Sequence, residues 1–117
     1  WFYVECENGQ KLDAALWKRD NGHKLLVVTL TYESDTFSSQ VCMAYDYDPT
    51  TRTLTPDLTV HKRLTQLEGT LCDLPRKGKN IGVRNIGNDT MRFYYLKWNG
   101  NGFSAPVKVA ANAYQRP

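Results

Sequence analysis

The sequence has few of the residues that build metal centres. Its three cysteines, Cys6, Cys42 and Cys72, are widely separated and form no Cys-X-X-Cys pair. Its two histidines, His23 and His61, cannot complete a structural zinc set at the usual spacing of ligands. We therefore expect no metal ion and no cofactor.

The small number of cysteines leaves the redox compartment open. In an exported chain, one disulfide would leave one cysteine unpaired. In a reducing compartment, all three would be buried free thiols that behave as small apolar side chains. Both alternatives are consistent with the sequence, and the spacing does not indicate which two cysteines would form the disulfide.

Long apolar runs and a strong charge are also missing. The longest apolar run, residues 25–30, has the length of a strand, whereas a membrane helix needs roughly 18 residues. Fifteen basic and twelve acidic residues give a net charge of +3, too weak to predict a nucleic-acid partner. Because the chain begins at Trp1, we expect either a cleaved signal peptide or a domain of a longer protein.

Short strands separated by turns dominate the pattern. Residues 1–7 place Phe2, Val4 and Cys6 on one face, and Asn8-Gly9 follows as a hairpin turn. Residues 14–19 are expected to form a strand that ends at a second such turn, Asn21-Gly22. In the next strand the two faces are Leu26, Val28, Leu30 and Tyr32 on one side and Leu25, Val27, Thr29 and Thr31 on the other.

The middle of the chain alternates again and then changes character. Residues 40–48 alternate with a period of two, Pro49 stops that strand, and residues 52–55 restart it. Asp57 is placed to cap a short helix near residues 58–67, with Gly69 ending it.

The last third returns to strands. Residues 80–86 lead through a Gly87-Asn88-Asp89 turn into residues 90–98, which are apolar on both faces and are predicted to be central and covered on both sides. Residues 99–102 turn the chain back into a final strand. Residues 110–117 are predicted to be a loose C-terminal tail.

These elements predict a mainly β fold. About eight or nine strands joined by short turns indicate one antiparallel meander that closes into a barrel or a sandwich. Residues 1–109 would form this single domain.

Asp46 and Asp48 are the first candidates for a site. They lie on the same face of a strand, with side chains about 7 Å apart. A calcium loop would need further oxygen ligands, and Arg52 stands where a ligand should be. A glycosidase pair would have to flank a bond from opposite sides, which two neighbours on one strand cannot readily do. Turn chemistry explains the stretch better, with Asp48 accepting turn amides before Pro49.

Other catalytic patterns are weak. A pairing of His23 or His61 with a cysteine or serine is not excluded by spacing, but no nucleophile elbow or cysteine signature is present. Residues 76–82 contain two glycines and two lysines without the spacing of a phosphate-binding loop. We therefore do not expect an enzyme.

Aromatic residues make up 12% of the chain, and several adjoin turns. Such rings could form a platform for a sugar or for a partner's side chain. Cross-strand pairs that close the ends of the core are the structural alternative. The candidate binding residues are Trp17, Tyr47, Trp98 and Phe103.

Two resemblances bear on function. The stretch "YVECENGQKL", residues 3–12, resembles the opening of the small exported inhibitors of C-type lysozyme, which are β-barrel domains. More broadly, "AYDYDPTTRTLTP", "LPRKGKNI" and "LKWNGNGF" resemble hairpins of small exported bacterial β proteins of unassigned activity. The resemblance implies an exported, non-catalytic module.

The expected function is therefore recognition of a protein or glycan partner outside the cytoplasm, in the periplasm, at the cell surface or as a secreted protein. Inhibition of a lysozyme-type hydrolase is the first alternative. A hydrolase with an unrecognised site is the second.

Overall fold

The chain folds into two antiparallel sheets joined by a helix. The computed structural model describes residues 1–6, 8–34, 38–67, 69–87 and 90–117. The first sheet has the order β1-β2-β3-β4-β5 and the second has the order β6-β7-β8-β9. The strands of the first sheet are β1 (Phe2–Glu5), β2 (Gln10–Lys18), β3 (Lys24–Glu33), β4 (Ser38–Asp48) and β5 (Thr53–Pro56). Those of the second are β6 (Thr70–Asp73), β7 (Ile81–Gly87), β8 (Thr90–Leu96) and β9 (Val107–Val109).

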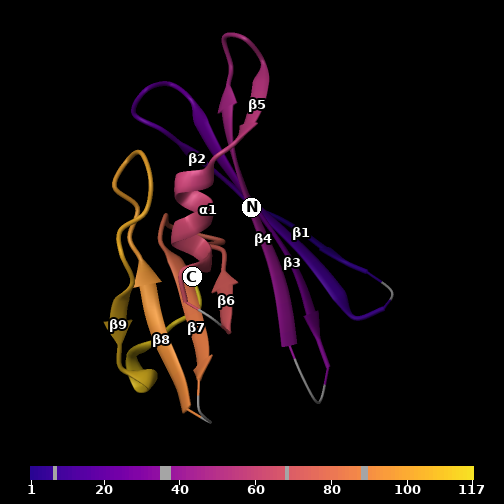
Figure 1. Ribbon diagram of the computed structural model, residues 1–117, viewed down its shortest axis with the longest axis vertical. Coiled ribbons are helices and arrows are strands. Elements are labelled where there is room, and N and C mark those ends of the chain that lie inside the picture. The colour runs from indigo at the N-terminus through magenta and orange to yellow at the C-terminus, as the bar shows by residue number, and fades with distance from the viewer. Residues whose placement is uncertain (7, 35–37, 68, 88–89) are drawn as a thin grey trace.

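The mainly β, antiparallel prediction is confirmed, but the closed barrel is not formed. Instead of one meander there are two, which face each other in a sandwich-like arrangement (Figure 1). The physical reason is the segment after β5, where the chain leaves the first sheet as a helix. No pairing among the described strands joins the two sheets into a closed ring.

The helix α1 (Leu58–Thr65) lies where the sequence predicts a short helix. Asp57 caps it, since its carboxylate accepts a hydrogen bond from the amide of Val60 at 3.0 Å. The helix ends at Thr65, several residues before Gly69, the predicted stop. Its buried side chains, Val60 and Leu64, belong to the same core as both sheets. No helix in the described part of the chain has the length and apolar character to cross a membrane.

The core lies between the sheets and under α1. On β3 the buried face carries Leu25 and Val27, and on the second sheet Ile81 and Leu96 face them. The side chains that point from β1–β5 into this space form what we call the inner face. Those that point away form the outer face.

The turn between β2 and β3 lies at the predicted Asn21-Gly22 position, but its loop has three residues where the sequence predicts two. The amide of Gly22 donates to the carbonyl of Arg19, and the amide of Arg19 donates to the carbonyl of His23. Gly22 has a φ of 87°, the left-handed conformation that glycine adopts without a steric penalty. The loop is therefore a three-residue hairpin connection. The predicted Gly87-Asn88-Asp89 turn falls partly outside the described residues.

The prediction that residues 90–98 are covered on both sides is wrong. In β8 only Leu96 is buried, and Met91 is 41% exposed. The reason is position, because β8 is followed at the sheet edge by β9, which is three residues long. Apolar residues on both faces of this strand do not place it in the middle of the protein.

The C-terminal segment, predicted to be a loose tail, lies against the second sheet. The ring of Tyr114 stacks on Phe93 and Tyr95, with centroid separations of 4.7 and 5.3 Å. Its hydroxyl donates to the carboxylate of Asp73 at 2.6 Å. The amide of Gln115 donates to the hydroxyl of Tyr95 at 2.9 Å. These contacts cover only the part of β8 around Phe93 and Tyr95.

This docking can be tested at Gly82, which is buried under the segment. A methyl group at Gly82 would collide with the Tyr114 hydroxyl and with Pro117. We expect Gly82→Ala to displace residues 110–117, to speed their removal by carboxypeptidase and to lower the unfolding free energy by about 1–2 kcal/mol. Gly102→Ala is the matched control, because a methyl group there meets nothing within 4 Å. Equal digestion of both variants and the wild type would contradict the docking.

Candidate functional site

Three of the four aromatic residues predicted from the sequence lie together. Ring centroids are 5.2 Å apart for Trp17 and Phe103, 5.1 Å for Trp98 and Phe103, and 6.0 Å for the two tryptophans. Trp17 is 4% exposed and Phe103 is 7% exposed. The indole N–H of Trp17 also donates to the carbonyl of Lys79 at 2.8 Å. The cluster closes one end of the core, so its buried rings do not offer a flat surface to a ligand.

Tyr47, the fourth aromatic candidate, lies apart from the cluster. It is on the outer face of β4, between Lys24 of β3 and Leu54 of β5. Trp17 pairs with Leu25 and is therefore on the inner face of the same sheet. The four residues do not form one surface.

Asp46 belongs to an ion-pair network beside the aromatic cluster. The guanidinium of Arg19, which is almost fully buried, donates to Asp46 at 2.6 Å and to Asp57 at 2.5 Å. The Nδ1 atom of His23 lies 2.7 Å from the other Asp46 oxygen. The network joins the β2–β3 turn, β4 and the cap of α1, which gives Asp46 a structural partner on each oxygen.

Asp48 has the turn role that the sequence predicts. Its carboxylate accepts the amide of Thr50 at 2.9 Å. Its other contact is longer, 3.7 Å to the Nε2 atom of His23. The described residues contain no group of three or more His, Cys, Asp or Glu side chains placed to hold a metal ion.

The surroundings of Asp46 favour its charged form. Burial alone would raise its pKa, but the hydrogen bonds from His23 and Arg19 outweigh burial and hold the pKa below the usual value. His23 and Asp46 form a histidine–carboxylate pair, although neither lines the cleft described below. No hydrogen bond in the described part of the chain joins this histidine to a serine or cysteine.

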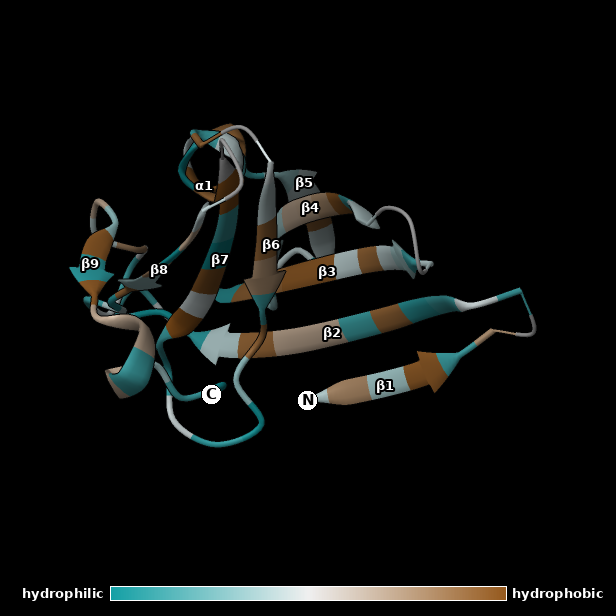
Figure 2. Cartoon of the chain, turned by 90° about the horizontal axis from the view of Figure 1, so that it is seen from below, coloured by the Kyte–Doolittle hydropathy of each residue, from teal (hydrophilic) through white to brown (hydrophobic). Residues whose placement is uncertain are grey.

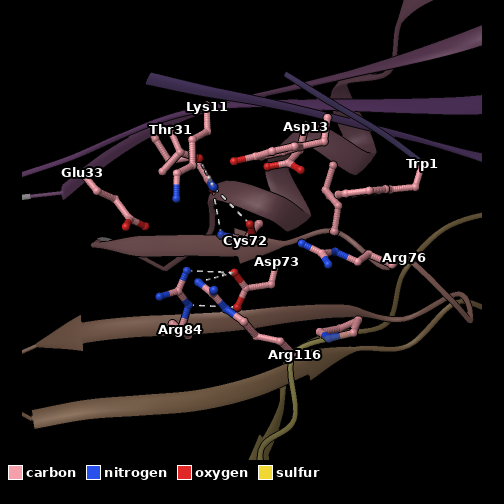
Figure 3. Close-up of a pocket in the computed structure, with 14 residues that line it drawn as sticks. Trp1, Lys11, Asp13, Thr31, Glu33, Cys72, Asp73, Arg76, Arg84 and Arg116 are labelled. Carbon is pink, nitrogen blue, oxygen red and sulfur yellow. Dashed lines mark hydrogen bonds and ion pairs between the residues drawn. The ribbon is translucent and has the colours of Figure 1, made fainter. Parts of the chain in front are cut away.

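A polar cleft of about 420 Å³ opens at the opposite end of the inner face (Figure 3). There the far ends of β2 and β3 extend past the second sheet (Figure 2). The first sheet contributes Lys11, Asp13, Thr31, Glu33 and Gln40, and the second sheet contributes Cys72, Asp73 and Arg84. Trp1, Tyr3, Arg76 and Arg116 complete most of the rim.

One carboxylate of the cleft is held on several sides. Asp73 accepts two hydrogen bonds from the Arg84 guanidinium, at 2.8 and 2.9 Å, and one from Tyr114. Arg116 approaches it at 3.4 Å. These donors fix the Asp73 carboxylate against the wall of the cleft, and its proximity in turn helps burial to raise the pKa of Tyr114.

Asp13 also lines the cleft, but unlike Asp73 it forms no ion pair with another described residue. Burial raises its pKa above the usual value, while a hydrogen bond from Trp1 and the charge of Arg76 pull it down. Trp1 stacks on Tyr3 with a centroid separation of 5.7 Å, and Arg76 lies 4.6 Å from the centre of the Trp1 ring. Trp1 is nevertheless 49% exposed. The cleft therefore offers a ligand both cationic hydrogen-bond donors and anionic hydrogen-bond acceptors.

The outer face of the first sheet has the opposite character. Cross-strand pairing aligns its side chains in three apolar rows. The rows are Phe2–Ala14–Val28–Met43, Val4–Leu12–Leu30–Val41 and Leu16–Leu26–Tyr45–Pro56. Leu16 is 61% exposed and Val41 is 57% exposed, so the described elements leave this face uncovered.

Neither the cleft nor the apolar outer face was predicted from the sequence. The signal for the outer face was present, because both faces of residues 24–33 are apolar and only one can face this core. The cleft had no local signal, since its walls come from segments far apart along the chain.

Comparison with models of known protein families, with curated proteins and with solved structures finds no match for this chain.

The Asp46 network predicts a pH dependence of stability. A carboxyl group whose pKa is lowered by folding contributes fully above its unfolded pKa of about 3.9. That contribution is lost as the pH falls through the lower folded pKa. We expect Asp46→Asn to reduce the unfolding free energy by about 1–3 kcal/mol at pH 7, with the difference from wild type shrinking below about pH 4.

Urea unfolding between pH 2 and 7 measures this difference. Asp48→Asn is the control, because an amide oxygen can still accept the Thr50 amide and the residue lies on the same strand face. A pH-independent deficit in Asp46→Asn would contradict the electrostatic role.

Proposed function

We propose that this protein is a non-catalytic binding module that recognises a partner protein through the outer face of its first sheet. The observation that carries the proposal is the set of three uncovered apolar rows on β1–β5. Extended apolar surfaces of this kind mark interaction sites in soluble proteins. Export of the protein, which the resemblance to small exported β proteins suggests, is part of the same proposal.

The size of the face supports this role. Four strands about 4.8 Å apart and three rows about 6.7 Å apart give a flat footprint on the order of 400 Å². That is about half of the roughly 800 Å² which each partner contributes to a standard interface. An interface of this kind has an apolar centre surrounded by a polar rim. The three rows would supply the centre.

The charges at the rim favour a partner different from this chain. The outer face ends in a row that pairs Lys18, Lys24 and Tyr47. No described outer-face residue of β1–β5 carries a carboxylate. A second copy of this face would therefore bring no acidic group to those lysines. The partner we infer presents an apolar surface with acidic residues at one edge.

The experiment compares the double variant Leu16→Glu/Val41→Glu with the wild type and with Leu58→Glu. Both target side chains are largely exposed, so the fold should persist, and Leu58 is an exposed leucine on α1. Proteins retained from an extract of the source cells are identified, and the retained protein is purified and titrated by calorimetry. We expect at least tenfold weaker binding by the double variant and unchanged binding by Leu58→Glu.

Other outcomes separate the alternatives. A wild-type dimer in sedimentation that the double variant dissociates would assign the face to a second copy and overturn the proposed heterologous partner. Stoichiometric inhibition of purified C-type lysozyme, undiminished in the double variant, would favour the inhibitor function instead. A monomeric wild type that retains nothing would contradict a binding role for this face.

A glycan is the second candidate partner, and the polar cleft is the observation that favours it. Lys11 and Arg76 make no ion pair within 4 Å in the described part of the chain, and Asp13 and Glu33 likewise have none. The cations could bind a sugar carboxylate while the acids accept sugar hydroxyls. An acidic sugar therefore fits the cleft better than a neutral one.

This second candidate is tested by NMR titration with glucuronic acid, with glucose as the neutral probe. We expect glucuronic acid to shift the indole signal of Trp1 and the side-chain amide signal of Gln40. Arg76→Ala should weaken the effect several-fold, whereas Lys97→Ala, exposed and absent from the cleft lining, should not change it. Equal shifts with glucose, or none with glucuronic acid, would reject the acidic-sugar site.

A further inference from the structure

Two of the three cysteines meet in the core although they come from different sheets. Cys42 is on the inner face of β4 and Cys72 is on β6, and both are buried. Cys6, at the end of β1, is exposed. Sequence spacing did not identify a pair, but the fold separates one cysteine from the other two.

One glutamine side chain holds the two cysteines together. The Oε1 atom of Gln40 accepts the backbone amide of Cys72 at 2.7 Å and lies 3.1 Å from the sulfur of Cys42. Its Nε2 atom donates to the carbonyl of Cys72 at 3.0 Å. The position of each cysteine relative to the other is therefore set by hydrogen bonds.

Each thiol also donates to an oxygen at this junction: that of Cys42 to the Oε1 atom of Gln40, and that of Cys72 to the carbonyl of Leu64 at 3.7 Å. Contact with the Cys72 thiol lowers the pKa of Cys42, and contact with Cys42, together with burial, raises the pKa of Cys72. Because one Gln40 side chain contacts both residues, it favours the approach of the two sulfur atoms to the S–S bonding distance of about 2.05 Å. Cys42 and Cys72 are thus neighbours in the core, whereas Cys6 is exposed at the surface.

We propose that Cys42 and Cys72 form a disulfide that links the two sheets, leaving Cys6 as a free thiol. The oxidant is a disulfide of a small thiol or of an oxidoreductase, RSSR. One cysteine thiolate attacks RSSR and releases RS⁻, which takes up the proton that the cysteine lost. The other thiolate then attacks the cysteine sulfur of the mixed disulfide and releases the second RS⁻. Two electrons pass to RSSR, which yields two RSH.

The bond would close a loop from β4 through α1 to β6. In the chain-entropy model, closing a loop of about 30 residues restricts the unfolded chain and stabilises the fold. For a domain of this size the melting temperature should rise by about 10 °C on oxidation. Because Gln40 and Cys72 line the cleft, the disulfide would also fix the rear wall of the cleft.

The test incubates the full chain with oxidised glutathione, blocks free thiols with iodoacetamide under denaturing conditions and maps the peptides by mass spectrometry. We expect Cys6 to be alkylated or to carry a glutathione mixed disulfide, and we expect a linked pair of peptides that contain Cys42 and Cys72. After reduction, all three should be alkylated. Cys6→Ser should keep both the linked peptides and the rise in melting temperature.

The variant Cys42→Ser should lose the linkage and any redox dependence of its melting temperature. If Cys42→Ser does not fold, the peptide map and melting temperatures of the Cys6→Ser chain, oxidised and reduced, still decide the question. A linkage of Cys6 to either buried cysteine, or three alkylated cysteines after oxidation, would overturn the proposal.

Discussion

The arrangement of the two sheets depends on the side chain of Gln40. It reaches from β4 to β6, an edge strand whose N–H and C=O groups at Cys72 point away from its neighbour β7. The amide of Gln40 satisfies both groups and also donates to the hydroxyl of Thr31 at 2.9 Å. Edge groups buried without a partner are costly, so this contact both satisfies β6 and holds it against the first sheet.

The contacts of Gln40 lie where the side chains of the inner face change from apolar to polar. Toward one end the inner face carries Ala15, Trp17, Leu25 and Val27, which pack against the second sheet and α1. Toward the other end it carries charged and hydroxyl side chains, which cannot close the gap by hydrophobic packing. The change falls near Thr29, whose buried hydroxyl has no hydrogen-bond partner among the described residues. The sandwich is therefore sealed at one end and open at the other.

The sealed end explains why the aspartates of residues 46 and 48 resemble a site without forming a metal-binding cluster. Arg19 has its guanidinium beside the aromatic cluster and needs carboxylate partners there, because an unpaired charge out of water is unfavourable. Asp46 and the helix cap Asp57 supply them. Asp57 thus has two structural functions, one in α1 and one in the ion-pair network.

Local chemistry made much of the fold predictable. The cap at Asp57, the turn at Asn21-Gly22 and the alternation of the long strands depend on neighbours in sequence, and each appears close to its predicted place. The predictions that were wrong concern features that depend on residues distant in the sequence. The burial of Trp17 is decided by residues about eighty positions away, and the exposure of β8 by its short neighbour. The cleft, which draws on both sheets and both termini, had no signal within any one segment.

The apolar outer face results from the alternation of side chains in the long strands, and it is the feature that bears on function. Strands that are apolar on both faces are usually covered on both sides. In this chain α1 and the second sheet cover only the inner face of β3 and β4, while the outer face presents Leu26, Val28 and their neighbours to solvent. The sequence of these strands therefore has the pattern of the middle layer of a three-layer structure. Two layers are described in this chain, and a bound protein would supply the third.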